Sequence, residues 1–229
     1  MRRAALPMYD WPEIRSQTEA FWDRLRAGLD LPALTHPVEM DDLLAIWRDP
    51  QTLIADACWG TVDLDLIGTQ RIIGRRSYDG VPGGAGTTYR SALVARDGKA
   101  AGPGATAVLP AGLDRMRLAA NSVDSRSGWL SIAEDAQMDD AGVLWTGAHR
   151  ASIRAVADGR ADVAAIDCRS WQLALDHEAA ARSLTVIGWT APRPGHFFMT
   201  GTKTPDAIAD ALSRRLVEAG QYAPETEDA

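Results

Sequence analysis

Three short segments of the sequence carry polar side chains in a pattern that suits anion binding. In NSVDSRSGWL, residues 121–130, Ser125 and Ser127 are hydroxyl donors beside Gly128, which would let a ligand approach the backbone. The N–H groups and positive dipole end of a helix starting here would attract an oxyanion. The alternative is that a serine or aspartate of this segment only caps the helix.

His149 and Asp167 form the second and third candidates. His149 is the one histidine at the predicted start of a helix, where the local field disfavours imidazolium, so a neutral ring could donate an N–H to a ligand. Asp167 ends the apolar run ADVAAID and could accept a hydrogen bond from a P–OH or ammonium group. The alternatives are an exposed or internally hydrogen-bonded histidine at His149 and a plain helix cap at Asp167.

The elements that would position these residues alternate along the chain. Apolar runs such as RMRLAAN, GVLWTG and ADVAAID predict strands, and residues 129–138, 148–159 and 168–181 predict helices. This alternation favours an α/β fold with parallel sheets covered on both faces. We expect two lobes, residues 1–92 with 193–229 and residues 93–192, and ligands bind beyond the carboxyl ends of such strands.

The composition excludes several partners. The chain has 229 residues, a formal net charge of −7 and a pI near 5.1, without the concentrated basic face that nucleic acid requires. No run of about 18 apolar residues is present, so we expect no membrane insertion. Cys58 and Cys168 stand apart from any metal-site spacing, and we expect no metal and no cofactor.

The first residues do not contain the apolar stretch of a signal peptide. The expectation for the sequence as it stands is a cytoplasmic protein, or a periplasmic one if the sequence is trimmed or its start misassigned. Enzyme motifs are also missing: there is no G-x-S-x-G or G-x-G-x-x-G, and GVPGGAG lacks the Lys-Ser/Thr of a phosphate loop. We therefore assign no catalytic residue and expect a binding protein, with a small-molecule enzyme or sensor on the same fold as the alternative.

The segment GAHRASIRAVADGRADVAAID resembles a region of the phosphate, phosphite and phosphonate substrate-binding proteins of ABC importers. SRSG is similar to the Ser-x-Ser-Gly anion turn of that family, DPQTLIADACWG to its strand and following loop, and YRSALVAR to its hinge-crossing strand. The resemblance implies a type II periplasmic-binding-protein fold, with doubly wound sheets joined by two crossovers. It also implies a receptor that closes on a small oxyanion, such as phosphonate or phosphate, in an interlobe cleft, and an ABC permease as a possible partner.

The same resemblance implies which residues contact the ligand. It places His149 and Asp167 at the ends of neighbouring strands, facing one cleft, with Asp167 as an orienting acceptor. The complete set of expected ligand contacts is Tyr9, Trp59, Tyr89, Ser125, Ser127, Gly128, His149 and Asp167. A different ligand remains open, because Trp59, Trp129 and Trp171 lie near predicted strand ends and could form an aromatic cage for an alkylammonium group.

Overall fold

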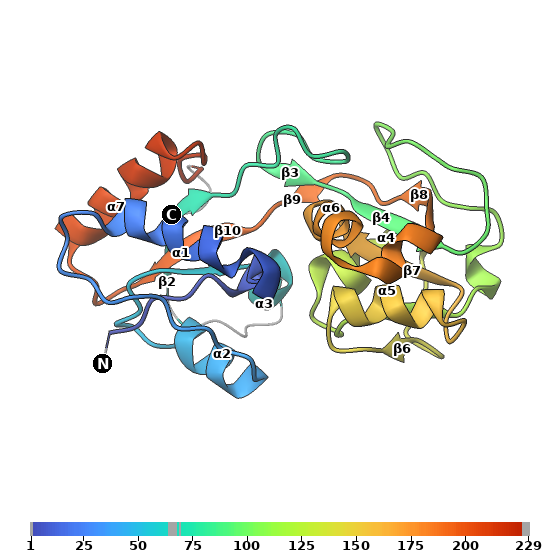
Figure 1. Ribbon diagram of the computed structural model, residues 1–229, viewed down its shortest axis with the longest axis horizontal. Helices are drawn as coiled ribbons and strands as arrows, with labels where there is room; N and C mark the ends of the chain where they lie inside the picture. The colour runs from blue at the N-terminus through green and yellow to red at the C-terminus, as the bar shows by residue number, and fades with distance from the viewer. Residues whose placement is uncertain (1, 64–67, 69, 226–229) are drawn as a thin grey trace. The chain divides into compact units, whose positions relative to one another are not determined.

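The computed structural model describes residues 2–63, 68 and 70–225, and the chain divides into two compact units. Unit 1 contains the residues up to Ser77 and those from Gly195 onward, and unit 2 contains Tyr78–Pro194. The chain thus passes from unit 1 into unit 2 and back once (Figure 1). The return lies close to the boundary expected after residue 192, whereas the outward passage precedes residue 92, which belongs to a strand of unit 2.

Unit 1 is built on a sheet with the strand order β1-β10-β2. Strand β10 (Phe197–Gly201) runs antiparallel to both β1 (Ala55–Ala57) and β2 (Gln70–Arg75). The amino-terminal segment expected to be a strand makes a single parallel bridge, Ala4 to Ile54, and then turns into the 3-10 helix η1 (Pro7–Tyr9). The extended segment expected over residues 63–74 is described only in part, because residues 64–67 and 69 lie outside the described residues.

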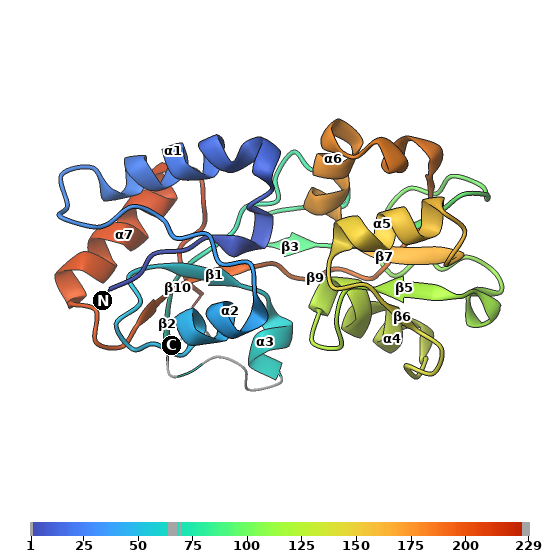
Figure 2. The same ribbon diagram turned by 60° about the horizontal axis from the view of Figure 1, so that its bottom comes forward.

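Helices cover both faces of this sheet because successive side chains of a strand point to opposite sides. Phe198 packs in a cluster with α1 (Arg15–Arg26) and α7 (Asp206–Glu218). Its neighbours Phe197 and Met199 pack in another cluster with α2 (Met40–Trp47). Figure 2 shows α1 and α7 on one side of the sheet and α2 on the other.

Unit 2 contains a five-stranded sheet with the order β6-β5-β7-β4-β8. Strand β5 (Leu118–Ala120) is parallel to β6 (Leu144–Trp145) and to β7 (Val163–Asp167). Strand β4 (Ser91–Ala95) is antiparallel to β7 and to β8 (Thr185–Trp189). Because β4 pairs with β7 over its whole length, it cannot belong to the other unit.

The alternation of elements favoured parallel sheets, whereas each of these two sheets contains a strand that runs antiparallel to its neighbours. The strand that reverses direction in each sheet is the first long one after a passage between units, β4 in unit 2 and β10 in unit 1. A helical crossover within one unit makes the next strand parallel, but a strand that arrives from the other unit is not bound by that connection.

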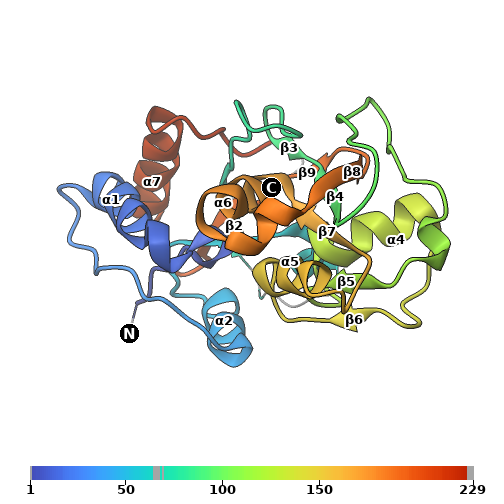
Figure 3. The same cartoon turned by 45° about the vertical axis from the view of Figure 1, so that its right-hand side comes forward.

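Helices of unit 2 cover both faces of its sheet. The π-helical turn η4 (Arg126–Leu130) leads into α4 (Ser131–Ala136), and Trp129 and Ile132 pack with Val163 and Ala165 on one face. Helices α5 (His149–Ala157) and α6 (Cys168–His177) lie on the opposite face (Figures 2 and 3). Helix α5 buries Ser152, Ile153, Ala155 and Val156, the spacing of an amphipathic helix that lies on a sheet.

Short elements complete the chain. These are η2 (Pro12–Ile14), α3 (Trp59–Asp63), β3 (Thr88–Tyr89), η3 (Leu113–Arg115), η5 (Ala179–Ser183) and β9 (Arg193–Pro194). Strands β3 and β9 pair with each other as a separate two-stranded ribbon of unit 2. Within the described part of the chain, none of the helices has the length and apolar character needed to span a membrane.

Candidate functional site

Three of the predicted site segments meet at one edge of the sheet in unit 2. Strands β6, β5 and β7 are parallel, so their carboxyl ends lie at the same edge, and each leads into a helix: α5, η4 with α4, and α6. His149 and Asp167 were expected at the ends of neighbouring strands. In the structure, β5 lies between the two strands concerned, β6 and β7. The strand between them carries the serine turn, so the order brings all three segments to this edge.

The serine turn is built as a helix start. Ser125 Oγ accepts a hydrogen bond from Gly128 N at 3.0 Å, and its carbonyl accepts from Trp129 N and Leu130 N. Ser125 is therefore a helix cap, the alternative considered for this segment. A hydroxyl that accepts one hydrogen bond still has its own proton to donate, so capping leaves Ser125 a possible ligand donor.

Gly128 is required by close packing in this turn. A Cβ atom at this position would collide with Oδ1 of Asn121, the first residue after β5. That Oδ1 atom is buried and has no hydrogen-bond partner among the described residues. Asn121 was not among the predicted site residues, although its position directly after a buried strand was a usable signal.

His149 is the first residue of α5, and its Nε2 lies 2.8 Å from Ser127 Oγ. Burial lowers the pKa of His149 to about 4, and a polar interaction with the Ala165 backbone opposes this only in part. The ring is therefore neutral at neutral pH, and its tautomer decides which partner donates. Ser127 and His149 therefore form a pair of uncharged hydrogen-bonding groups.

Hydrogen bonds also connect Ser127 to the sheet of unit 2. Its carbonyl accepts a hydrogen bond from Ser91 Oγ at 2.8 Å, and Ser91 N donates to Thr190 Oγ1 at 2.8 Å. Ser91 begins β4 opposite Asp167 on β7. Ser91 and Thr190 were not among the predicted site residues, because only the long-range pairing of β4 brings them to this edge.

Asp167 ends β7 and caps α6. Its Oδ1 accepts hydrogen bonds from Arg169 N at 2.8 Å and Ser170 N at 2.9 Å, and the residue is buried. The cap considered for this aspartate is thus observed in the structure, and its role as an acceptor for a ligand proton stays a prediction.

Tyr89 lies in unit 2, buried, with its ring stacked on Tyr78 at 5.4 Å between centroids. Tyr9 and Trp59 belong to unit 1. The Tyr9 ring is 5.0 Å from that of His196 and lies beneath the Arg76 guanidinium at 5.1 Å. These three aromatic residues stay predicted ligand contacts.

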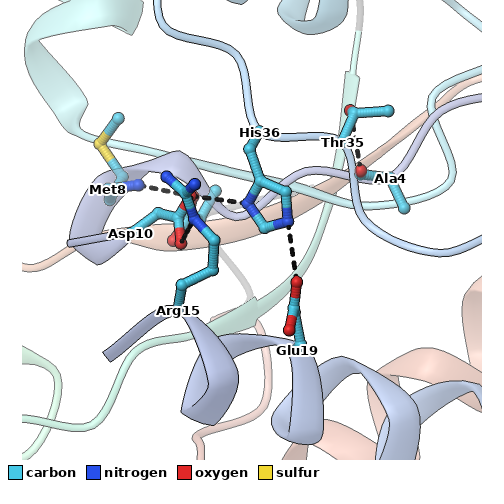
Figure 4. Close-up of polar contacts among 8 residues, drawn as sticks. Ala4, Met8, Asp10, Arg15, Glu19, Thr35 and His36 are labelled. Carbon is cyan, nitrogen blue, oxygen red and sulfur yellow. Dashed lines mark hydrogen bonds and ion pairs between the residues drawn. The ribbon is translucent and has the colours of Figure 1, made fainter. Parts of the chain in front are cut away.

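Polar contacts hold the segment that carries Tyr9. Met8 N donates to Oδ1 of Asp56, a buried carboxylate paired with Arg76 at 2.6 Å. Burial raises the pKa of Asp56, and the Arg76 charge opposes the rise. Asp10 contacts His36 at 2.7 Å and Arg15 at 3.3 Å, as Figure 4 shows.

An aromatic cage for an alkylammonium group stays a prediction. Trp59 already has the Arg75 guanidinium over its ring at 4.9 Å and donates its Nε1 proton to Gly195 O at 2.9 Å. Trp129 and Trp171 are both buried, in η4 and in α6 of unit 2. Among the described residues, no group of three or more His, Cys, Asp or Glu side chains could hold a metal ion.

Known structures share this fold at low sequence identity. PhnD1 from Prochlorococcus marinus, in complex with methylphosphonate, has a TM-score of 0.69 and 13% identity, with 95% of this chain and 82% of that chain covered. A binding protein of a Pseudomonas aeruginosa ABC phosphonate transporter has a TM-score of 0.69 and 16% identity, covering 99% and 82%. A Xanthomonas citri protein bound to ATP has a TM-score of 0.62 and 16% identity, covering 95% and 82%.

Two α/β units joined by two passages of the chain define the type II periplasmic-binding-protein fold. Residues 60–229 match the model of a family described as ABC transporter, phosphonate, periplasmic substrate-binding protein. The chain belongs to this family of solute-binding proteins. No curated protein sequence gives a significant match to it.

Proposed function

We propose that this protein binds a small phosphorus oxyanion, a phosphonate or phosphate, at the edge of unit 2 where the serine turn, His149 and Asp167 meet. The observation that carries the proposal is the hydrogen bond between Ser127 Oγ and a neutral His149 beside the capped start of η4. Buried hydroxyl, imidazole and backbone N–H groups together are the donors that an oxyanion needs.

The proposed contacts in unit 2 are Ser125, Ser127, Gly128, His149, Asp167 and Tyr89. Tyr9 and Trp59 of unit 1 complete the proposed set. The methylphosphonate in the Prochlorococcus protein and the family match both support a phosphorus ligand. The Xanthomonas protein bound to ATP has the same fold, so the choice of ligand depends on side chains rather than on the fold.

An ABC permease is the proposed partner, and the periplasm the proposed place of action. Both follow from the description of the family, whose members are periplasmic receptors of ABC transporters. This favours the periplasmic alternative over the cytoplasmic one.

Calorimetry with methylphosphonate, inorganic phosphate, 2-aminoethylphosphonate and choline tests the proposal. We expect the wild type to bind at least one phosphorus compound and not choline. Ser127→Ala and His149→Ala should each weaken binding by about 1.5–3 kcal/mol, the usual value of a hydrogen bond to a charged group. Asp167→Asn should weaken 2-aminoethylphosphonate more than a fully ionised phosphonate, because only the former offers an ammonium proton.

Ser183→Ala is the matched control, since Ser183 is an exposed serine of unit 2 that donates only to a backbone carbonyl, that of Ala180 at 2.9 Å. It should bind as the wild type does. Choline binding without any phosphorus ligand would contradict the proposal. Phosphorus NMR of the bound phosphonate shows whether the protein converts it to another compound. Such a conversion would identify an enzyme instead of a receptor.

A further inference from the structure

A buried carboxylate lies where α5 meets the corner between α6 and η5. The Glu178 side chain is 7% exposed, and its Oε2 accepts hydrogen bonds from Arg150 Nε at 2.7 Å and Arg154 Nε at 2.9 Å. Burial alone would raise the pKa of Glu178, but the hydrogen bonds from the two arginines lower it to about 2. The carboxylate is therefore ionised at neutral pH and bound to two cations of one helix.

Of the three helix starts at the candidate site, that of α5 has no capping side chain. Ser125 caps η4 and Asp167 caps α6, whereas Ala148 occupies the cap position of α5. The first N–H groups of a helix have no acceptor within the helix, so an uncapped first turn frays more easily. His149 lies in this uncapped turn.

The contacts of Glu178 hold this same turn. Arg150 follows His149 directly, and its NH2 group also donates to His177 O at 3.0 Å. Arg150 and Arg154 are four residues apart and so lie on one face of α5. Glu178 Oε1 accepts from Ala180 N at 3.3 Å, which ties the carboxylate to the start of η5. One side chain thus joins the first two turns of α5 to the end of α6.

We propose that Glu178 is a positioning residue of the oxyanion site: by holding Arg150 and Arg154 it orients the first turn of α5 and keeps His149 Nε2 within hydrogen-bond reach of Ser127. Glu178 acts through the helix and does not contact the ligand. The inference rests on the proposed function, and it makes Glu178 a determinant of affinity although it belongs to none of the predicted ligand contacts.

Calorimetry with methylphosphonate measures the effect on affinity. Glu178→Gln keeps the shape of the side chain but removes its charge, and we expect binding to weaken about tenfold, within the range of coupling between residues in one network. Glu178→Asp should recover part of the loss. Arg150→Gln, next to His149, should weaken binding more than Arg154→Gln, one turn further along the helix. These two variants test the proposal if Glu178→Gln does not fold.

Asp162→Asn is the matched control. Asp162 forms an ion pair with Arg117 at 2.7 Å in the same unit, just before β7, at the opposite end of that strand from Asp167. The Asp162→Asn variant should have a lower melting temperature than the wild type but the same affinity for methylphosphonate. Equal losses of affinity in Asp162→Asn and Glu178→Gln would reduce the role of Glu178 to general stability and overturn the proposal.

The nitrogen NMR signals of His149, recorded without ligand, give a second readout that does not depend on the proposed function. They should shift in Glu178→Gln, where the hydrogen bond to Ser127 is weakened, and stay unchanged in Asp162→Asn. Unchanged His149 signals in Glu178→Gln, together with wild-type affinity, would overturn the inference.

Tighter binding of both methylphosphonate and sulfate by Glu178→Gln would also overturn it, since a released Arg150 would then act as a general anion contact. If the wild type binds none of the oxyanions, the proposed function fails and the spectra still decide whether Glu178 positions His149.

Discussion

At the scale of single residues, the candidate site relies on groups that are uncharged or already hydrogen-bonded. His149 is held neutral by burial, and Ser125 and Asp167 cap helices. Such a site has its donors in place before the ligand arrives, so little side-chain entropy is lost on binding. The buried histidine also makes stability depend on pH.

The pKa of His149 is about 4 in the folded chain, below its value of about 6.5 in an unfolded chain. The unfolded chain therefore takes up a proton as the pH falls through about 6.5, and the folded chain does so only near 4. The contribution of the neutral His149 to the free energy of unfolding is therefore complete above about pH 6.5 and is lost as the pH falls to about 4. We expect His149→Gln to remove about 2 kcal/mol of the stability difference between about pH 7 and about pH 4.5.

Urea unfolding of the wild type and His149→Gln at both pH values checks this prediction. The substitution itself lowers stability at both pH values, so only the difference between them is informative. An equal loss of stability on acidification in the two proteins would contradict a buried neutral His149.

Gly128 offers a second test at the same scale. Its Cβ position is occupied by Oδ1 of Asn121, so Gly128→Ala should lower the free energy of unfolding by about 1–3 kcal/mol through overpacking. The double variant Gly128→Ala with Asn121→Ala should regain most of this stability, because the colliding amide is gone. Denaturant unfolding of the single and double variants measures both effects. If the double variant is no more stable than Gly128→Ala, the collision with Asn121 is not the cause of the lost stability.

At the scale of elements, α4 is fastened to the connection between β8 and β9. Asp135 near the end of α4 accepts from Arg193 at 2.6 Å and from Ala191 N at 2.7 Å. The side chains of Asp135 and Arg193 are 9% and 14% exposed, so the pair is largely shielded from water. The helix that begins at the serine turn is thereby tied to the segment that leaves unit 2.

Asp135→Asn should lower the free energy of unfolding by about 2 kcal/mol, since the mostly buried Arg193 then keeps only its ion pair with the half-exposed Glu134 at 3.2 Å. Asp162→Asn is the exposed comparison, with Asp162 and Arg117 34% and 57% exposed, and should cost about 1 kcal/mol or less. Urea unfolding of the two variants provides the measurement. Similar costs for both would show that shielding from water does not set the value of the Asp135 contact.

At the scale of the whole molecule, unit 2 is one continuous segment and unit 1 is assembled from both ends of the chain. A ligand at 100 times its dissociation constant stabilises the state that binds it by about 2.7 kcal/mol. We expect methylphosphonate at that concentration to raise the melting temperature by about 5–10 °C. If the units unfold in separate steps, the step of unit 2 should move.

Differential scanning calorimetry of the wild type and of His149→Ala tests this expectation. The variant lacks a proposed donor and should show little shift at the same ligand concentration. An equal shift in both proteins would place the ligand away from His149.

Much of the local structure could be predicted from the sequence. The start of a helix at His149 and the end of a strand at Asp167 both agree with the structure. A helix cap was the alternative to a ligand contact at Ser125 and Asp167, and the structure shows the cap at each residue. These features depend on side chains and backbone groups within about four residues of each other, so the local sequence contains them.

The long-range pairings could not be predicted in this way. Parallel sheets were expected from the alternation of elements, and the family resemblance implied neighbouring strands before His149 and Asp167. The structure instead pairs Ser91 with Asp167 across antiparallel strands and inserts β5 between β6 and β7. Nothing near Ser91 in the sequence specifies its partner, because strand order is chosen by the burial of distant segments against one another.

The sequence by itself thus determined the α/β class and the ends of the elements that carry the proposed contacts, since local hydrogen bonding and apolar periodicity decide these. Only the tertiary structure decided that Ser127 bonds His149, that Glu178 holds the start of α5, and that Arg75 covers the ring of Trp59. Each of these contacts joins residues at least sixteen positions apart in the printed sequence. Their geometry follows from strand order and helix packing, which form only when the whole core is assembled.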